Sequence, residues 1–173
     1  MDVLENRDQW FATFKSGWLA HYEKTGEFDW KIYNRPTNKQ SISGKGTDLQ
    51  RSRLILISTA GGYLRESQKP FDAPDPYGDF TLRTFPTSTP FETIAFAHDH
   101  YDHTAVDQDP QVLLPLRHLE NMVAEGLIGE LAPTVISYSG YQPWVTRIVD
   151  ELIPALLPLV KSEGPHAALL VPS

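Results

Sequence analysis

The sequence predicts an α/β protein: a mostly parallel β-sheet of the Rossmann-like kind with helices on both faces, preceded by an aromatic-rich helical arm. Short apolar runs alternate with segments whose apolar residues recur at helical spacing. Such alternation is typical of a parallel sheet whose strands are buried on both sides. We therefore divide the chain into a helical arm with a polar loop, residues 1–50, and an α/β domain, residues 51–173.

The arm is predicted from an aromatic face in residues 4–24. Trp10, Phe14 and Trp18 recur at every fourth position, as on one side of a helix. Such a face either packs on the body of its own protein or forms a dimer interface. The second alternative is the basis for expecting a homo-oligomer.

A polar segment at residues 34–48 separates the arm from the domain, and its "GKGT" stretch invites comparison with a nucleotide-binding loop. The comparison fails, because Lys39 stands where the motif needs its first glycine and Gly46 stands where it needs serine or threonine. We interpret the segment as a surface connection.

The domain is predicted to contain four strands and two helices. The strands are expected at residues 53–60, 92–98, 133–140 and 166–173, and the helices at 114–129 and 142–164. Pro154 and Pro158 should kink or split the second helix. The proline-rich segments 69–80 and 85–90 are expected to be loops. Because ligands bind beyond the carboxyl ends of parallel strands, segments that follow the strands should form the site.

The stretch "FAHDHYDHTAVDQD", residues 96–109, follows the second predicted strand and holds three histidines and four aspartates. Crowding so many ionisable groups on one turn gains little stability, so we interpret the cluster as functional. Histidine–aspartate pairs suit general acid–base work near neutral pH. The candidate catalytic residues are His98, His100, Asp102 and His103. The candidate substrate-binding residues at the same edge of the sheet are Gly61, Gly62, Asp107, Tyr138 and Gly140.

The spacing H-x-H-x-D-H also matches the zinc motif of metallo-β-lactamase-type hydrolases. That fold needs further ligands downstream, and the two later histidines, His118 and His166, are expected in a helix and at the opposite edge of the sheet. A simpler divalent metal site stays an alternative, with His98, His100, His103 and Asp107 as candidate ligands.

Composition limits the classes of function. The net charge of −7 and the lack of a basic run argue against nucleic acid and anionic membrane as partners. The first residues lack the apolar region of a signal peptide, which predicts a cytoplasmic protein. The sequence contains no cysteine, so its own residues offer no thiol for disulfide, metal or nucleophilic chemistry.

Several stretches together resemble the glycine, sarcosine and betaine reductase selenoprotein B family, which includes relatives of D-proline reductase. They are "STAGGYL", "PFDAPDPYGDFTLRTFPTSTP", "AHDHYDHTAVDQDPQVLLPLRHLENMVAEGLIGELAP", "SYSGY" and "HAALLVPS". The resemblance runs from about residue 53 to the end of the sequence. It implies an α/β fold, a small amino-acid-type substrate and reductive cleavage of a carbon–nitrogen bond, carried out together with partner subunits.

The resemblance also implies a selenocysteine or cysteine nucleophile just after the strand that corresponds to "HAALLVPS". Here the given sequence stops at Ser173. We expect a missing selenocysteine, encoded by UGA, to follow Ser173. The alternative is a member without redox chemistry, which is either a metal-dependent protein or a non-catalytic binding subunit of a reductase complex.

Overall fold

The computed structural model describes residues 3–40 and 46–173, which belong to two compact units, Met1–Gly44 and Lys45–Ser173. Part of the polar segment 34–48, including "GK" of "GKGT", lies outside the described residues. None of the helices in the described ranges is long and apolar enough to cross a membrane.

The N-terminal unit contains the predicted aromatic helix. It runs as α1 (Arg7–Phe14), a π-helical turn (Lys15–Leu19) and α2 (Ala20–Thr25). Trp18 stacks on Phe28 with ring centroids 5.8 Å apart and lies 5.2 Å from Trp30. The aromatic face is therefore covered at least in part by the unit's own returning segment, an arrangement that the helical spacing alone does not indicate.

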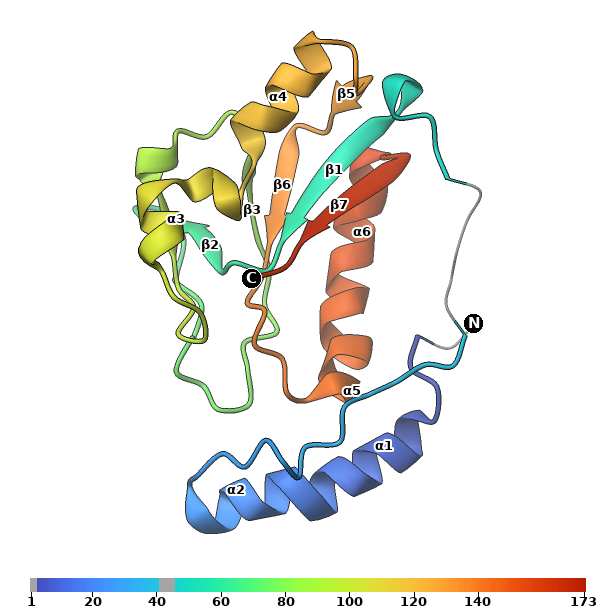
Figure 1. Cartoon of the computed structure of the whole chain (residues 1–173), viewed down its shortest axis with the longest axis vertical. Coiled ribbons are helices and arrows are strands. Elements are labelled where there is room, and N and C mark those ends of the chain that lie inside the picture. Colours follow the sequence, from blue (N-terminus) through green and yellow to red (C-terminus); the bar gives the residue numbers. More distant parts are fainter. Residues whose placement is uncertain (1–2, 41–45) are drawn as a thin grey trace. The chain divides into compact units, whose positions relative to one another are not determined.

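The second unit is built on a five-stranded sheet in which β1 is central (Figure 1). The strands are β1 (Arg53–Ser58), β3 (Arg83–Pro86), β5 (Glu130–Leu131), β6 (Thr134–Ser137) and β7 (Ala167–Val171). Strands β5, β6 and β7 all pair with β1 in parallel, and only β3 is antiparallel, to β6. The predicted α/β fold with a mostly parallel sheet is confirmed.

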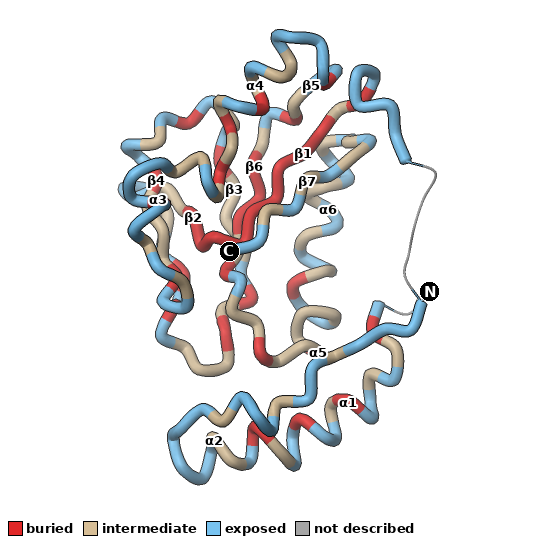
Figure 2. The backbone as a smooth tube through the Cα atoms, viewed as in Figure 1, coloured by how far each residue is buried: buried red, intermediate tan, exposed pale blue. Residues whose placement is uncertain are grey.

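Helices cover both faces of this sheet, as predicted. They are α3 (Thr104–Gln108), α4 (Leu116–Ala124), α5 (Val145–Arg147) and α6 (Ile153–Glu163). On one face Leu54 and Leu56 of β1 pack in a cluster that includes Leu116 of α4. On the other face Ile55 and Ile57 pack with α6. Because both sets of β1 side chains are buried, the strand reads as a continuous apolar run (Figure 2).

The prediction that residues 92–98 join the parallel sheet is wrong. The strand there is β4 (Ile94–Phe96), which pairs antiparallel with β2 (Gly62–Leu64) in a separate two-stranded sheet. The reason is that β6 and β7 occupy both sides of β1 near its carboxyl end. His98 therefore still follows a strand, but that strand belongs to the two-stranded β2–β4 sheet and not to the five-stranded sheet.

Two further predictions need correction. Residues 85–90 are not wholly a loop, since Phe85 and Pro86 end β3; an edge strand tolerates proline because one side of its backbone needs no partner. The helix expected at 142–164 begins only at Val145. A π-helical turn (Ile148–Leu152) shifts its hydrogen-bond register just before Pro154, and α6 then continues through Pro158.

Candidate functional site

Four chain segments meet at the carboxyl end of β1. Gly61 donates its backbone N–H to the carbonyl of Tyr138, after β6, and accepts from Ala97, after β4, each over 3.0 Å. Ser173, after β7, donates its backbone N–H to Thr59 Oγ1 over 2.8 Å. The structure therefore brings together the strand ends at which the sequence predicted a site, and Figure 1 shows β7 ending beside β1.

Glycines make this close meeting sterically feasible. Gly61 has a φ of +68°, and a Cβ atom there would collide with the carbonyl oxygen of Ala97. A Cβ on Gly140 would lie 2.9 Å from both Ser173 Oγ and Thr59 Oγ1. Gly61 therefore has no space for a side chain, and a side chain at Gly140 would require the two hydroxyls to move. The sequence motif alone does not reveal this steric reason.

His98 is the buried centre of the cluster, with 4% of its surface exposed. Its Nδ1 accepts the backbone N–H of His100 over 3.1 Å, so the proton of the neutral ring must sit on Nε2. That nitrogen lies 3.5 Å from Ser173 Oγ. Burial, helped by the neighbouring His100 and His103, lowers the pKa of His98 to about 4. At neutral pH His98 is therefore an uncharged hydrogen-bond donor, rather than a group that titrates near pH 7.

His100 and His103 are each stacked on a tyrosine. The His100 ring lies 3.7 Å from the ring of Tyr141, whose hydroxyl donates to the carbonyl of Pro76. The His103 ring lies 4.5 Å from that of Tyr101, whose hydroxyl donates to the carbonyl of Ala60. These tyrosines fix the two imidazoles in place. Neither was singled out from the sequence as a support for the histidines.

The three histidines are also linked through the backbone of the turn. His103 Nε2 lies 2.5 Å from the carbonyl oxygen of His98. Because a carbonyl only accepts, Nε2 carries the proton in this bond and Nδ1 is the basic nitrogen of the neutral ring. His103 thus holds the backbone of His98 in position and leaves Nδ1 for other contacts.

The two aspartates singled out from the sequence do not pair with these histidines. The Asp102 carboxylate accepts from the backbone N–H and the hydroxyl of Thr104 over 2.9 and 2.7 Å, at the start of α3. These bonds hold the pKa of Asp102 below its usual range. Asp107 lies further along α3 and lines a cavity. Asp102 does not form the expected pair with a histidine; instead it forms a local Asx turn with Thr104, as short acidic side chains often do.

Two of the candidate substrate-binding residues serve packing. A Cβ on Gly62 would meet Leu114, Ser137 and Phe96 at ordinary contact distances, so the backbone here is enclosed by core side chains. Tyr138 packs against the core cluster beneath α6, and burial raises the pKa of its hydroxyl. Both residues lie at the predicted edge, with Gly61 and Gly140.

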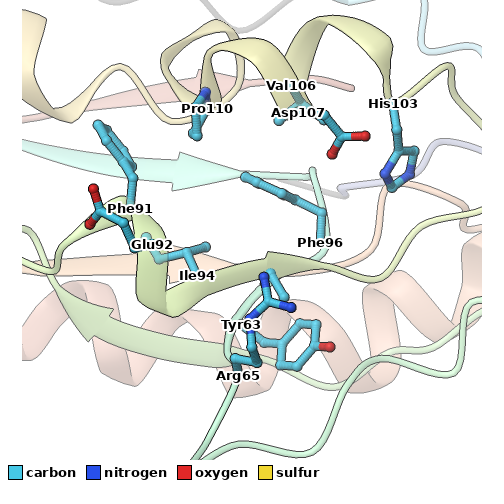
Figure 3. Close-up of a pocket in the computed structure, with 11 residues that line it drawn as sticks. Tyr63, Arg65, Phe91, Glu92, Ile94, Phe96, His103, Val106, Asp107 and Pro110 are labelled. Atoms are coloured by element: carbon cyan, nitrogen blue, oxygen red, sulfur yellow. The ribbon is translucent and has the colours of Figure 1, made fainter.

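A cavity of about 560 Å³ lies next to this cluster, between the small β2–β4 sheet and α3 (Figure 3). His103 and Asp107 line it from the α3 side. Its other polar lining residues are Tyr63, Arg65 and Glu92, which the sequence analysis missed. Tyr63 and Arg65 are two positions apart on and just after β2, a spacing that places side chains on one face of a strand. Only the pairing of β2 with β4 turns that face into a cavity wall.

The candidate metal ligands do not converge. Within residues 3–40 and 46–173, no three His, Asp or Glu side chains are grouped in a way that could hold a metal ion. His98 Nε2 points toward Ser173, His100 stacks on Tyr141, and Asp107 faces the cavity.

Comparison with known proteins gives a distant reductase relationship. No family model matches the chain, and no solved structure matches it. Over 120 residues the chain is 28% identical to D-proline reductase subunit gamma of Acetoanaerobium sticklandii. The matched segment covers 69% of this chain and 48% of that protein, so the chain spans about half the length of this relative. The chain is thus a distant relative of a reductase subunit.

Proposed function

We propose that the protein is a component of a reductase that cleaves a carbon–nitrogen bond in a small amino-acid-type substrate, with His98 at the reacting centre. The relative supports the reductase assignment, since its name makes it one subunit of D-proline reductase. The observation that carries the proposal is the neutral His98, whose Nε2–H points at Ser173 just after β7.

The proposed reaction requires a source of electrons and protons. Reductive cleavage turns one carbon–nitrogen bond into a carbon–hydrogen and a nitrogen–hydrogen bond, and so consumes two electrons and two protons. A dithiol or a selenol–thiol pair supplies them when it is oxidised to a disulfide or selenenyl sulfide. These 173 residues include no cysteine, so the pair must be supplied from outside them.

In this proposal His98 donates a hydrogen bond to the group that develops negative charge at the reacting centre. A neutral imidazole suits that task because it is a donor at neutral pH and needs no proton uptake to act. His100 and His103, held by Tyr141 and Tyr101, would move protons to the leaving amine. The glycines at 61 and 140 let the segments that carry these residues pack closely together.

The test is dithiol-dependent cleavage of D-proline, with glycine as the comparison substrate, by the product of the source gene purified together with its natural partners. His98→Leu should lower turnover by about 100-fold or more, as for loss of a donor to a developing anion. His98→Gln, which keeps an N–H donor, should retain part of the activity. The control is His118→Gln on the exposed side of α4. Equal turnover in the wild type and His98→Leu would rule out the assigned role.

The same purified protein tests the two remaining alternatives. Stoichiometric metal in protein made without an affinity tag, lost on chelation together with activity, would favour a metal-dependent enzyme that uses His98, His100, His103 or Asp107. Binding of partner subunits without any effect of the His98 variants on turnover would favour a non-catalytic subunit. Light scattering of the full chain measures whether it also forms a homo-oligomer.

A further inference from the structure

The cavity between the β2–β4 sheet and α3 carries opposite charges on opposite walls (Figure 3). Arg65 comes from the β2 side, and Asp107 comes from α3. Glu92, a second carboxylate, lies beside β4 on the same side of the cavity as Arg65. Between them the lining is apolar and includes Ile94, Phe96 and Val106.

These charges are not neutralised by the protein itself. Throughout the described residues, the side chains of Arg65, Glu92 and Asp107 make no hydrogen bond or ion pair with another residue, and all three residues are exposed to the solvent at the rim of the cavity. By contrast, Arg53, Arg117 and Arg147 all pair with a glutamate. Unpaired charges of opposite sign around one cavity can bind a ligand that carries a negative group at one end and a positive group at the other.

The size of the cavity narrows the class of ligand. Its volume of about 560 Å³ falls within the range of pockets that enclose drug-sized molecules, and exceeds what one small amino acid fills. The apolar middle suits a short hydrocarbon side chain. A free dipeptide has the required features: a carboxylate at one end, an ammonium group at the other and an apolar side chain between them.

We propose that this cavity is a second binding site, separate from the His98 centre, for a zwitterion of dipeptide size. Arg65 binds its carboxylate, and Asp107, across the cavity from Arg65, binds its ammonium group. His103 lines the cavity with one part of its ring while Nε2 holds the carbonyl of His98. A ligand bound in the cavity therefore contacts His103, the residue that holds the backbone of His98 in position.

The probe is glycyl-leucine, titrated into the full chain and followed by calorimetry and by the imidazole NMR signals of His103. The wild type should bind it, and N-acetylglycyl-leucine and glycyl-leucinamide should each bind at least tenfold more weakly, because each lacks one charge. Arg65→Met and Asp107→Asn should each weaken binding by a similar factor. The His103 signals should shift on binding, whereas those of His118 should not.

The matched controls are Arg51→Met and Glu125→Gln, which remove one charge of each sign at exposed positions that do not line the cavity. They should bind glycyl-leucine like the wild type. Equal affinity for the three probes, an unchanged affinity in Arg65→Met, or no binding by the folded wild type would each overturn the proposal. None of these results affects the role of His98, which is tested by turnover, so the two proposals fail independently.

Discussion

Ser173 Oγ lies 3.5 Å from Nε2 of His98, although 75 positions separate the two residues in the sequence. The contact joins the end of β7 to the turn after β4, across two different sheets. It is completed by Thr59, whose hydroxyl accepts the backbone N–H of Ser173. The imidazole that lies next to Ser173 is therefore a neutral hydrogen-bond donor, and the proposed reductase role depends on this arrangement.

The depressed pKa of His98 predicts acid sensitivity. In the unfolded chain this histidine takes up a proton near its ordinary pKa of about 6.5, whereas the folded protein resists protonation until the pH nears 4. Its contribution to stability is therefore complete above pH 6.5 and is lost as the pH falls toward 4, with a slope of at most about 1.4 kcal/mol per pH unit. Urea unfolding at several pH values measures the slope.

The comparison variant for this experiment is His98→Gln, which cannot take up the proton. Its stability should fall less steeply than that of the wild type between pH 6.5 and 4. Parallel curves for the two proteins would mean that His98 titrates normally in the folded state.

The stacking of Tyr141 on His100 predicts that two substitutions of Tyr141 lower the stability by different amounts. Tyr141→Phe keeps the ring but loses the hydroxyl bond to Pro76, and should cost about 1 kcal/mol. Tyr141→Leu also loses the stack and should cost about 1 kcal/mol more. Thermal unfolding measures both, and the imidazole NMR signals of His100 should shift far more in the leucine variant. Similar His100 spectra in the two variants would show that the ring of Tyr141 does not position this histidine.

The backbone at Gly61 predicts a large penalty for a methyl group. Gly61→Ala forces an alanine into a φ of +68° and pushes its Cβ onto the Ala97 carbonyl, so it should cost about 3 kcal/mol or more. Gly126→Ala is the matched control, because its φ is +72° but a Cβ there meets nothing within 4 Å. It should cost about 1 kcal/mol. Chemical denaturation of both variants gives the difference, and equal losses would mean that the collision is relieved by movement.

Two buried serines that face each other across β1 and β6 predict opposite responses. Ser58 donates its hydroxyl to the carbonyl of Leu113 over 2.9 Å, so Ser58→Ala should cost about 1–3 kcal/mol. Ser137 Oγ is equally buried and, in the described part of the chain, has no hydrogen-bond partner. Ser137→Ala should therefore leave stability unchanged or raise it. A marked loss of stability in Ser137→Ala, measured by urea unfolding, would contradict this expectation.

Much of the second unit could be predicted because its signals are local. The run "LILIS" forms β1 as expected, since its side chains are buried on both faces and need no alternation. The strand at 133–140 was placed correctly for the same reason, whereas β7, also placed correctly, alternates half-buried and exposed residues. The pairing partner of residues 94–96 could not be predicted, because it depends on β6 and β7 having filled both sides of β1.

The sequence by itself determined the fold class and the position of the histidine turn after a strand, because apolar periodicity and strand order act over short distances. Only the tertiary structure decided what each member of that turn does. Burial keeps His98 neutral, and Thr104 donates hydrogen bonds to the carboxylate of Asp102. The pairing of β2 with β4 creates a cavity that Arg65 lines. The physical reason is that solvation, hydrogen-bond partners and cavity walls come from residues distant in sequence, whose approach is set by packing.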